Sequence, residues 1–302
     1  MDEEKYTNLT MRSIGFGEFN NKEFEEEIRL DVMDNPTQSF IREYKDGRMV
    51  LEYYKEYSER LYVIVRTGLH SRIKEEVTTV YNNRCEPYFK AKYDLEVKDL
   101  EVGEVGPYFA CYAVCDDAAT GMPIIFKVQN MIEYLDCLQD NTLDYSGINV
   151  VGVATEGTII LPVEKDRHDQ SSKAENQYLR GLLERARSGD KEALDILDKE
   201  ERKIDVELKE RLRKEDFLTV MEGYFIPTTD MDAVYAVLGT IQELETRENK
   251  KTMEEIYWFN IDVNGMLLEI VINKKDLRGV PCKGMRFMGT CKVQGTVCFD
   301  LE

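Results

Sequence analysis

The sequence predicts an α+β protein made mostly of antiparallel strands, and three observations lead to this class. Turn dipeptides separate runs of alternating apolar and polar residues in the first half of the chain. A charged middle stretch carries apolar residues at helical spacing. The final segment alternates again and ends in "RFMGTCKVQGTVCFD". We therefore expect an acidic α+β unit over 1–163, a charged linker and helical connector over 164–222, and a β-barrel-like unit over 223–302.

Composition and charge limit the classes of function. The 302 residues carry a net charge of −19 with 42% hydrophobic residues, which is typical of a folded, acidic protein. This charge disfavours nucleic acid and anionic membranes as partners, because both present negative phosphates. No apolar run is long enough to span a membrane, and "MDEEKYTN" lacks the features of a secretory signal. Seven cysteines, an odd number, lead us to expect reduced thiols and a cytoplasmic location.

The first segment is expected to be a mostly antiparallel sheet. Asp46-Gly47 lies between two extended runs and predicts a hairpin. Residues 88–97 alternate as a half-buried strand, and "YFACYAVC" and "GMPIIFKVQN" predict an antiparallel pair. A further pair is expected within "VVGVATEGTIILPV", with its turn at Glu156-Gly157.

Helices are expected beside this sheet and in the connector. Residues 21–32 and 71–81 each place apolar side chains along one edge, and Ser71 is a suitable cap for the second helix. We expect both helices to cover one side of the sheet. From about residue 177 to 223 the helical pattern lies within a run of mixed charge, so most of that helix surface is expected to be solvated.

The strongest hairpin signal is Asn264-Gly265 in "YWFNIDVNGMLLEIVIN". A two-residue turn at this dipeptide places apolar residues opposite one another on a single face. The turn chemistry and the apolar pattern therefore agree on one register. The expected pairs are Val263 with Met266, Ile261 with Leu268, Phe259 with Ile270, and Tyr257 with Ile272.

The terminal strand pattern completes the C-terminal unit. Its glycines, Gly289 and Gly295, suit a strand that bends strongly. Cys291 and Cys298 lie on opposite faces, so they do not form one dithiol or metal site. With "AVYAVLGTIQEL" as a preceding strand, we expect a small antiparallel barrel, with the oligonucleotide-binding type as one option.

Four blocks of the sequence carry a resemblance to a known family: "MRSIGF", "LLERARSGDKEAL", "YFIPTTDMDAVYAVLGTI" and "INKKDLRGVPCKGMRFMGTCKVQGTVCF". Together they resemble a family of uncharacterised clostridial and related Firmicute proteins, a domain of unknown function of similar length. The resemblance implies a bacterial, cytoplasmic protein. It implies no activity, cofactor or catalytic residue.

A search for catalytic and metal-binding patterns leads us to expect none. His70 and His168 have no cysteine or second histidine at ligand spacing. Cys111 and Cys115 are expected to be small core residues, and neighbouring acids disfavour a reactive thiolate. Phosphate-binding glycine loops and hydrolase motifs are missing from the sequence. We therefore predict no catalytic residue, no metal and no cofactor.

Two surface features stand out from this background. Tyr53, Tyr54 and Tyr57 are close together, and since neighbouring residues in a strand face opposite ways, we expect an exposed aromatic surface among them. The second feature is a basic patch with a local charge of +5 over residues 273–292. Its six basic residues are Lys274, Lys275, Arg278, Lys283, Arg286 and Lys292.

These features support three hypotheses of different class. The leading one is a non-enzymatic binding or protein-interaction protein, whose basic patch docks on its own acidic half, on a second copy or on another protein. The alternative is a single-stranded nucleic-acid binder that uses the barrel and the basic patch. A second alternative is an unrecognised enzyme with a cleft between the β-rich units.

Overall fold

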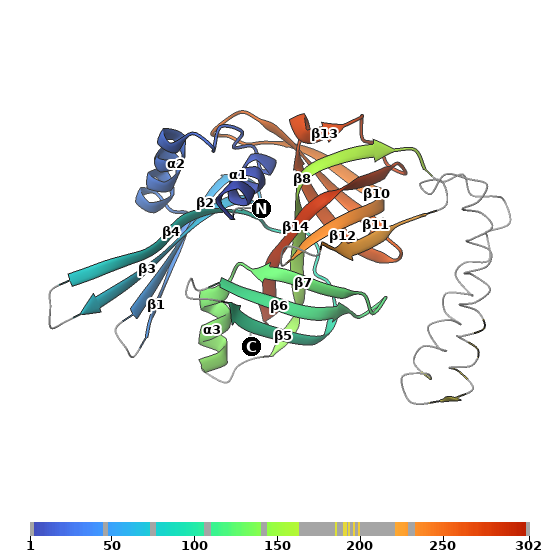
Figure 1. Cartoon of the computed structure of the whole chain (residues 1–302), viewed down its shortest axis with the longest axis horizontal. Coiled ribbons are helices and arrows are strands. Elements are labelled where there is room, and N and C mark those ends of the chain that lie inside the picture. Colours follow the sequence, from blue (N-terminus) through green and yellow to red (C-terminus); the bar gives the residue numbers. More distant parts are fainter. Residues whose placement is uncertain are drawn as a thin grey trace. The chain divides into compact units, whose positions relative to one another are not determined.

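The computed structural model describes residues 3–44, 48–72, 77–105, 110–139, 144–162, 221–228 and 233–299, together with six single positions between 163 and 220. The chain divides into two compact units (Figure 1). One unit combines residues 1–160 with 223–302, and the other is 161–222. The two flanking segments, which sequence analysis expected as separate units, thus share one compact unit. Five of the single positions in the second unit are helical, namely Arg185, Lys191, Ala193, Ile196 and Lys199. Apart from these five positions and Asp190, Met221 and Glu222, the predicted connector lies outside the described residues, His168 included.

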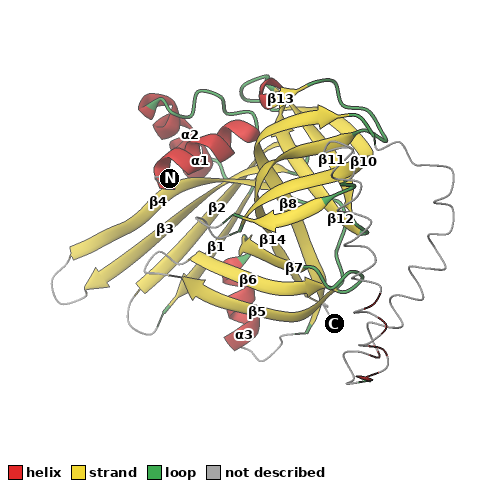
Figure 2. Ribbon diagram, turned by 45° about the vertical axis from the view of Figure 1, so that its right-hand side comes forward, coloured by secondary structure: helices red, strands yellow, loops and turns green. Residues whose placement is uncertain are grey.

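Sheet A is an antiparallel meander of four consecutive strands. The first two strands flank the predicted Asp46-Gly47 turn and pair in antiparallel fashion, which confirms that hairpin. Helices α1 (Glu3–Ser13) and α2 (Lys22–Asp34) lie against this sheet (Figure 2). The amide of Glu23 donates to the side chain of Asn21, which caps α2, the helix expected over residues 21–32. The strands are β1 (Gln38–Glu43), β2 (Arg48–Ser58), β3 (Leu61–Arg72) and β4 (Val77–Phe89).

Sheet B has ten strands, of mixed direction, and draws on both ends of the chain. Its path runs β13-β8-β12-β11-β10-β14-β7-β6-β5, and β9 pairs with β10 beside this path. Helix α3 (Met131–Gln139) follows β7. The strands are β5 (Val97–Val105), β6 (Ala110–Asp117), β7 (Pro123–Val128), β8 (Tyr145–Ile160), β9 (Tyr224–Pro227), β10 (Val234–Glu248), β11 (Glu255–Val263), β12 (Met266–Asn273), β13 (Leu277–Arg278) and β14 (Arg286–Phe299).

Strand β8 is the central element of the unit. It pairs with β12 in parallel and with β14 in antiparallel direction. Because β12, β11, β10 and β14 also pair in succession, these pairings lead from β8 around to β8 again. Along β8, Ile148 and Val150 contribute to one apolar core, while Val151 and Val153 contribute to another. Both faces of β8 are therefore buried over residues 148–153.

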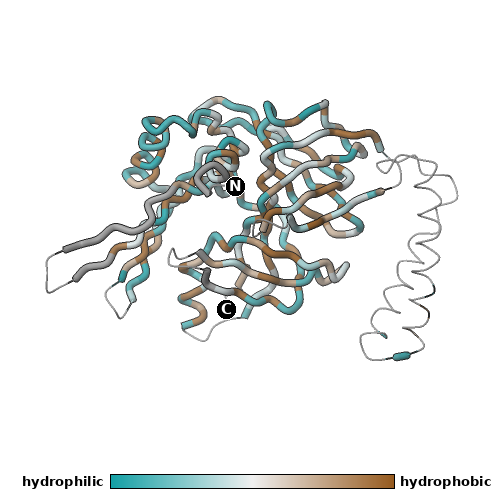
Figure 3. The backbone as a smooth tube through the Cα atoms, in the orientation of Figure 1, coloured by the Kyte–Doolittle hydropathy of each residue, from teal (hydrophilic) through white to brown (hydrophobic). Residues whose placement is uncertain are grey.

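The second core joins sheet A and its helices to sheet B. Met11, Phe16 and Ile28 from the helical region meet Trp258 and Val271 from β11 and β12. Trp258 is fully buried, and its indole nitrogen donates to the carboxylate of Glu269 at 2.6 Å. Apolar residues recur along the strands of sheet B, whereas most residues of α2 are hydrophilic (Figure 3). The fold is thus α+β, and its two sheets are held together by apolar packing.

Several predicted elements are confirmed. Strands β11 and β12 pair in the predicted register, including Val263 with Met266 and Tyr257 with Ile272. The turn residues Asn264 and Gly265 both have positive φ, 53° and 95°, as a tight two-residue hairpin requires. Strands β6 and β7 form the expected antiparallel pair. The predicted strand at "AVYAVLGTIQEL" is part of β10.

Other expectations were wrong. The helix expected over 71–81 is replaced by the ends of β3 and β4, where β-branched residues such as Val77 favour the extended chain. The hairpin expected at Glu156-Gly157 is one continuous strand, β8, because β14 pairs with it on both sides of that dipeptide. The strand expected over 88–97 is mostly loop between β4 and β5. Helices α1 and α3 were not predicted.

Candidate functional site

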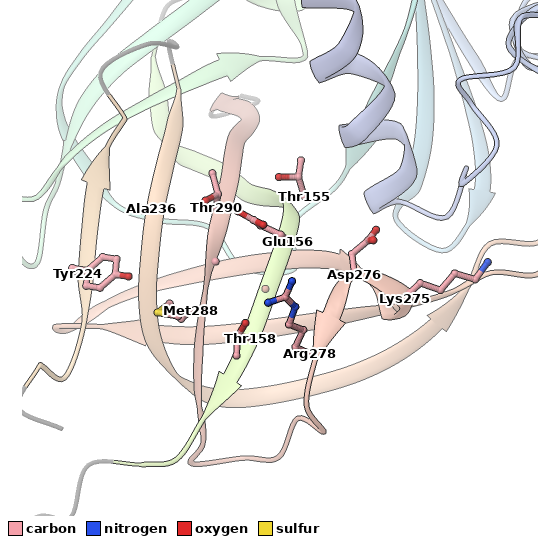
Figure 4. Close-up of a pocket in the computed structure, with 12 residues that line it drawn as sticks. Thr155, Glu156, Thr158, Tyr224, Ala236, Lys275, Asp276, Arg278, Met288 and Thr290 are labelled. Carbon is pink, nitrogen blue, oxygen red and sulfur yellow. The ribbon is translucent and has the colours of Figure 1, made fainter. Parts of the chain in front are cut away.

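A polar groove of about 570 Å³ lies on the outer face of sheet B, where β8 and β14 pair. We call it the β8–β14 groove (Figure 4). Strands β9, β10 and β13 and the short helix η2 (Lys274–Asp276) also contribute to its wall. Its lining residues are Thr155, Glu156, Gly157, Thr158, Tyr224, Ala236, Lys275, Asp276, Arg278, Met288, Gly289 and Thr290.

Strand register arranges the lining side chains in two rows across the sheet. The first row runs from Arg278 through Thr158, Met288 and Leu238 to Tyr224. The second row, two residues away along each strand, runs from Glu156 through Thr290 and Ala236 to Ile226. Both rows are charged or hydroxylated at the β13–β8 end and apolar or aromatic at the β9 end. The groove therefore has a polar end and an apolar end.

A bulge in β8 directs Glu156 into the groove. Ala154 pairs with Cys291 and Glu156 pairs with Thr290, so Thr155 is one extra residue in β8. Before the bulge Ala154 faces the apolar core, and after it Gly157 faces the same core. Without the extra residue, the alternation of the strand would place Glu156 in that core. The carboxylate is instead exposed beside Thr290.

Two facing glycines form the floor of the groove. Gly157 pairs with Gly289, and the ring of Phe287 lies on the core side of both. A Cβ atom on Gly157 would be 2.4 Å from Cε2 of Phe287. Glycine is therefore needed here for close packing, and the fully buried Phe287 supports the floor from below.

The rim of the groove is fixed by ion pairs to other elements. Asp276 accepts from Nε of Arg12, at the end of α1, at 2.9 Å. Lys275 forms an ion pair with Glu254, and Asn273 donates to the carbonyl of Arg12 and to Glu254. Helix η2 is thereby held in place, and the charges of Lys275 and Asp276 are both neutralised by partners outside the groove.

Arg278 and Glu156 differ from these rim residues. Within the part of the chain that the structure describes, neither has an ion-pair or hydrogen-bond partner. Figure 4 shows the guanidinium of Arg278 extending over β8, whereas Lys275 points away. At the apolar end, the phenol of Tyr224 is neutral at physiological pH, as tyrosine ordinarily is, and burial raises its pKa further. The groove thus combines one available cation and one available carboxylate with hydroxyl groups and apolar surface.

The predicted basic patch is not a continuous surface of free cations. Lys274 pairs with Glu255 at 2.6 Å, and Lys275 pairs with Glu254. Arg286 is only 4% exposed. Lys283 and Arg278 are exposed, but only Arg278 lines the groove with Lys275. Lys292 is half-buried and lies close enough to Glu86 to lower the pKa of that carboxyl.

The predicted aromatic surface is also different from expectation. Tyr54 and Tyr57 are buried, at 6% and 5% exposure, and only Tyr53 is half-buried. The hydroxyl of Tyr54 donates to the carbonyl of Gln129 at 2.6 Å, and that of Tyr57 donates to Asp31 at 2.8 Å. Both faces of β2 are covered, one by the helices and the other by sheet B, so the three tyrosines offer no exposed aromatic surface.

A buried ionic network, which sequence reasoning missed, lies on the inner side of sheet A. Arg66 donates to Glu52 at 2.6 Å and to Glu86 at 3.3 Å, and Lys127 of β7 pairs with Glu86 at 2.6 Å. Burial alone would raise the pKa of Glu86, but the charges of Lys127 and Arg66 outweigh it and lower the pKa to about 2. The network therefore stays ionised and connects the two sheets.

Metal and thiol chemistry gain no support from the described residues. Among them, no three His, Cys, Asp or Glu side chains gather as a metal site. The seven cysteines are free, and burial raises the pKa of Cys115 and Cys291 to about 12. His70 lies in β3 opposite Arg48 rather than before a helix. No helix in the described ranges is long and apolar enough to cross a bilayer.

Comparisons with known proteins place the chain in one family. A search of curated proteins and a search of solved structures gave no match. A family model described as "Domain of unknown function, E. rectale Gene description (DUF3881)" matches residues 11–295, which include nearly every element of both sheets. The Firmicute family indicated by the sequence blocks is thereby supported, and the chain belongs to the DUF3881 family.

Proposed function

We propose that this protein is a non-enzymatic binding protein, and that the β8–β14 groove holds a small molecule with a charged head and an apolar body. The observation that carries the proposal is the change from charged to apolar residues along the two cross-strand rows. The volume of the groove lies within the range of roughly 300–1,000 Å³ that is typical of small-molecule sites.

The supporting architecture is rigid. The groove lies on strands, its floor is packed against Phe287, and its rim is held by ion pairs to Arg12 of α1 and to Glu254, the residue before β11. A site on fixed strands loses little conformational entropy when a ligand binds. Ile226, which is 55% exposed, extends the apolar end beyond the groove itself.

The finer fold assignment is part of the same proposal. We infer that β8, β12, β11, β10 and β14 form a closed five-stranded barrel, as expected for the C-terminal segment but with β8 from the first half as its fifth strand. The circular succession of pairings supports this assignment. Similarity of this barrel to the oligonucleotide-binding fold stays a prediction.

The nucleic-acid alternative draws less support from the geometry. Of the six predicted basic residues, Lys274 and Lys275 are ion-paired and Arg286 is buried. A nucleic-acid surface needs several accessible cations along one path. Association with another protein or with a second copy of this chain stays a prediction.

The test uses the fluorescent probe 1-anilinonaphthalene-8-sulfonate, which has an anionic head and an aromatic body. Ala236→Trp fills the apolar end of the groove and is expected to weaken probe binding by about tenfold, equivalent to about 1.4 kcal/mol. Leu267→Trp is the matched control, because Leu267 is 50% exposed and does not line the groove. Equal probe affinity in both variants would show that the probe binds elsewhere and would contradict the proposal.

A further inference from the structure

We propose that the ligand of the β8–β14 groove is a free α-amino acid with a large apolar side chain. This inference rests on the proposed function and specifies its ligand. It comes from the two charged residues at the polar end of the groove and from their position relative to its apolar end.

The polar end offers one cation and one anion. Arg278 pairs with Thr158 across the sheet, and Glu156 precedes Thr158 by two residues on the same face. Arg278 and Glu156 are thus diagonal neighbours on parallel strands, whose Cα atoms lie roughly 8 Å apart in a regular sheet. Among the described residues no carboxylate pairs with Arg278 and no cation pairs with Glu156. Two opposite charges at this spacing are suited to a ligand that itself carries both.

The head of an α-amino acid supplies this combination. Its carboxylate can accept two parallel hydrogen bonds from the guanidinium of Arg278, which is the strongest geometry for such a pair. Its ammonium group can donate to Glu156, and the hydroxyls of Thr158 and Thr290 are positioned to satisfy the remaining polar groups. A residue inside a peptide has neither charge, and each peptide end carries only one. An ammonium and a carboxylate on the same carbon atom, the closest spacing of the two charges, are supplied by a free amino acid or a close analogue.

The apolar end accounts for the side chain. From Thr158 the first row continues to Met288 and Tyr224, and from Thr290 the second row continues to Ala236. Methionine adapts its shape to different apolar groups, and Ala236 leaves space above its strand. The groove thus favours amino acids with large apolar side chains, namely phenylalanine, tyrosine, leucine and methionine. Glycine would leave the apolar surface uncovered, and glutamate would place a charge on it.

Isothermal titration calorimetry of the full chain tests the ligand class. L-phenylalanine, L-tyrosine, L-leucine and L-methionine are titrated at millimolar concentration, with glycine and L-glutamate as controls. N-acetyl-L-phenylalanine lacks the ammonium and 2-phenylethylamine lacks the carboxylate. We expect at least one of the four apolar amino acids to bind, and each one-charge analogue of phenylalanine to bind about tenfold or more weakly than phenylalanine.

Variants connect each charge of the ligand to its residue. Arg278→Gln should weaken the binding of L-phenylalanine but leave the affinity for 2-phenylethylamine unchanged. Glu156→Gln should also weaken the binding of L-phenylalanine, but it should leave the affinity for N-acetyl-L-phenylalanine unchanged. Lys283→Gln, at an exposed cation outside the groove, is the matched control. This crossed pattern distinguishes direct recognition from a general loss of folding.

The outcomes separate this inference from the proposed function. If none of the four amino acids binds, or if N-acetyl-L-phenylalanine binds as tightly as phenylalanine, the zwitterion proposal is overturned. In that case the groove is still supported as a binding site, as long as Ala236→Trp weakens the binding of the fluorescent probe. If phenylalanine binds equally to wild type and Ala236→Trp, it binds outside the groove and the zwitterion proposal is overturned. The proposed function fails only if Ala236→Trp also leaves the affinity for the fluorescent probe unchanged.

Discussion

Two largely buried carboxylates among the described residues, Glu269 and Glu86, have several donors or cations around them. Glu269 accepts from the indole of Trp258 and from the amides of Lys92 and Tyr93. Burial raises its pKa, and these hydrogen bonds oppose the rise. The pKa of Glu86 is instead lowered, to about 2, because the charges of Lys127 and Arg66 outweigh the effect of burial. The ionic network around Glu86 therefore makes a pH-dependent contribution to stability.

Glu86→Gln is predicted to destabilise the protein at pH 7 by roughly 2–4 kcal/mol, because Lys127 loses its buried partner. The pKa of Glu86 is lower in the folded than in the unfolded chain, so its ionised form stabilises the fold above the unfolded pKa of about 4.5. This contribution falls as pH decreases from there toward about 2. Urea unfolding between about pH 3.5 and 7 should show the difference between variant and wild type shrinking as pH falls.

Glu101→Gln, on the exposed surface of β5, is the matched control and should show almost no difference at any pH. A difference for Glu86→Gln that stays constant down to about pH 3 would contradict the predicted low pKa.

At the scale of elements, locally encoded hairpins were predicted correctly and longer-range pairings were not. The β11–β12 hairpin follows from Asn264-Gly265 and the flanking alternation, both of which act within a few residues. The β8 strand was mistaken for a hairpin because Glu156-Gly157 resembles a turn. Its continuity through Glu156-Gly157 depends on β14, more than a hundred residues later in the chain.

Gly157→Ala is predicted to destabilise the protein by roughly 1–3 kcal/mol, because the new methyl group would meet the ring of Phe287 at 2.4 Å. The free energy of unfolding from urea titration measures this effect. Gly103→Ala is the control, since a Cβ there meets nothing within 4 Å, and it should be neutral or slightly stabilising. A neutral Gly157→Ala would mean that Phe287 does not lie across the glycine as described.

At the scale of the whole molecule, the larger compact unit depends on pairing between distant segments. Sheet B takes β5 to β8 from the first half and β9 to β14 from the end of the chain. Strand β8 separates two apolar cores and contributes residues to both. The C-terminal segment alone would therefore expose the edges of β12 and β14 that β8 covers.

A fragment of residues 223–302 is accordingly predicted to lack cooperative unfolding in circular dichroism when it is alone. An equimolar mixture with a fragment of residues 1–222 should regain strand signal and a cooperative transition. Val151→Asp in the larger fragment should prevent this recovery, because Val151 is buried in β8 next to β12. Lys98→Asp, on β5, is the control and should not prevent the recovery. Cooperative unfolding of the 223–302 fragment by itself would contradict the prediction.

The sequence by itself determined the α+β class, the charged middle segment, helix α2, the hairpins with clear turn residues and the family. The structural elements depend on local propensity and periodicity, which act over a few residues, whereas the family follows from the resemblance of four sequence blocks and from the family-model match. Only the tertiary structure decided which strands share a sheet, that Tyr54 and Tyr57 are buried, and that Lys274 and Lys275 are paired. It also decided the β8–β14 groove, because the bulge at Thr155 and the approach of β13 to β8 arise only when distant strands pair. Arg278 was singled out from the sequence as one of six basic residues, but its role beside Glu156 follows from register between segments more than a hundred residues apart, which no local pattern encodes.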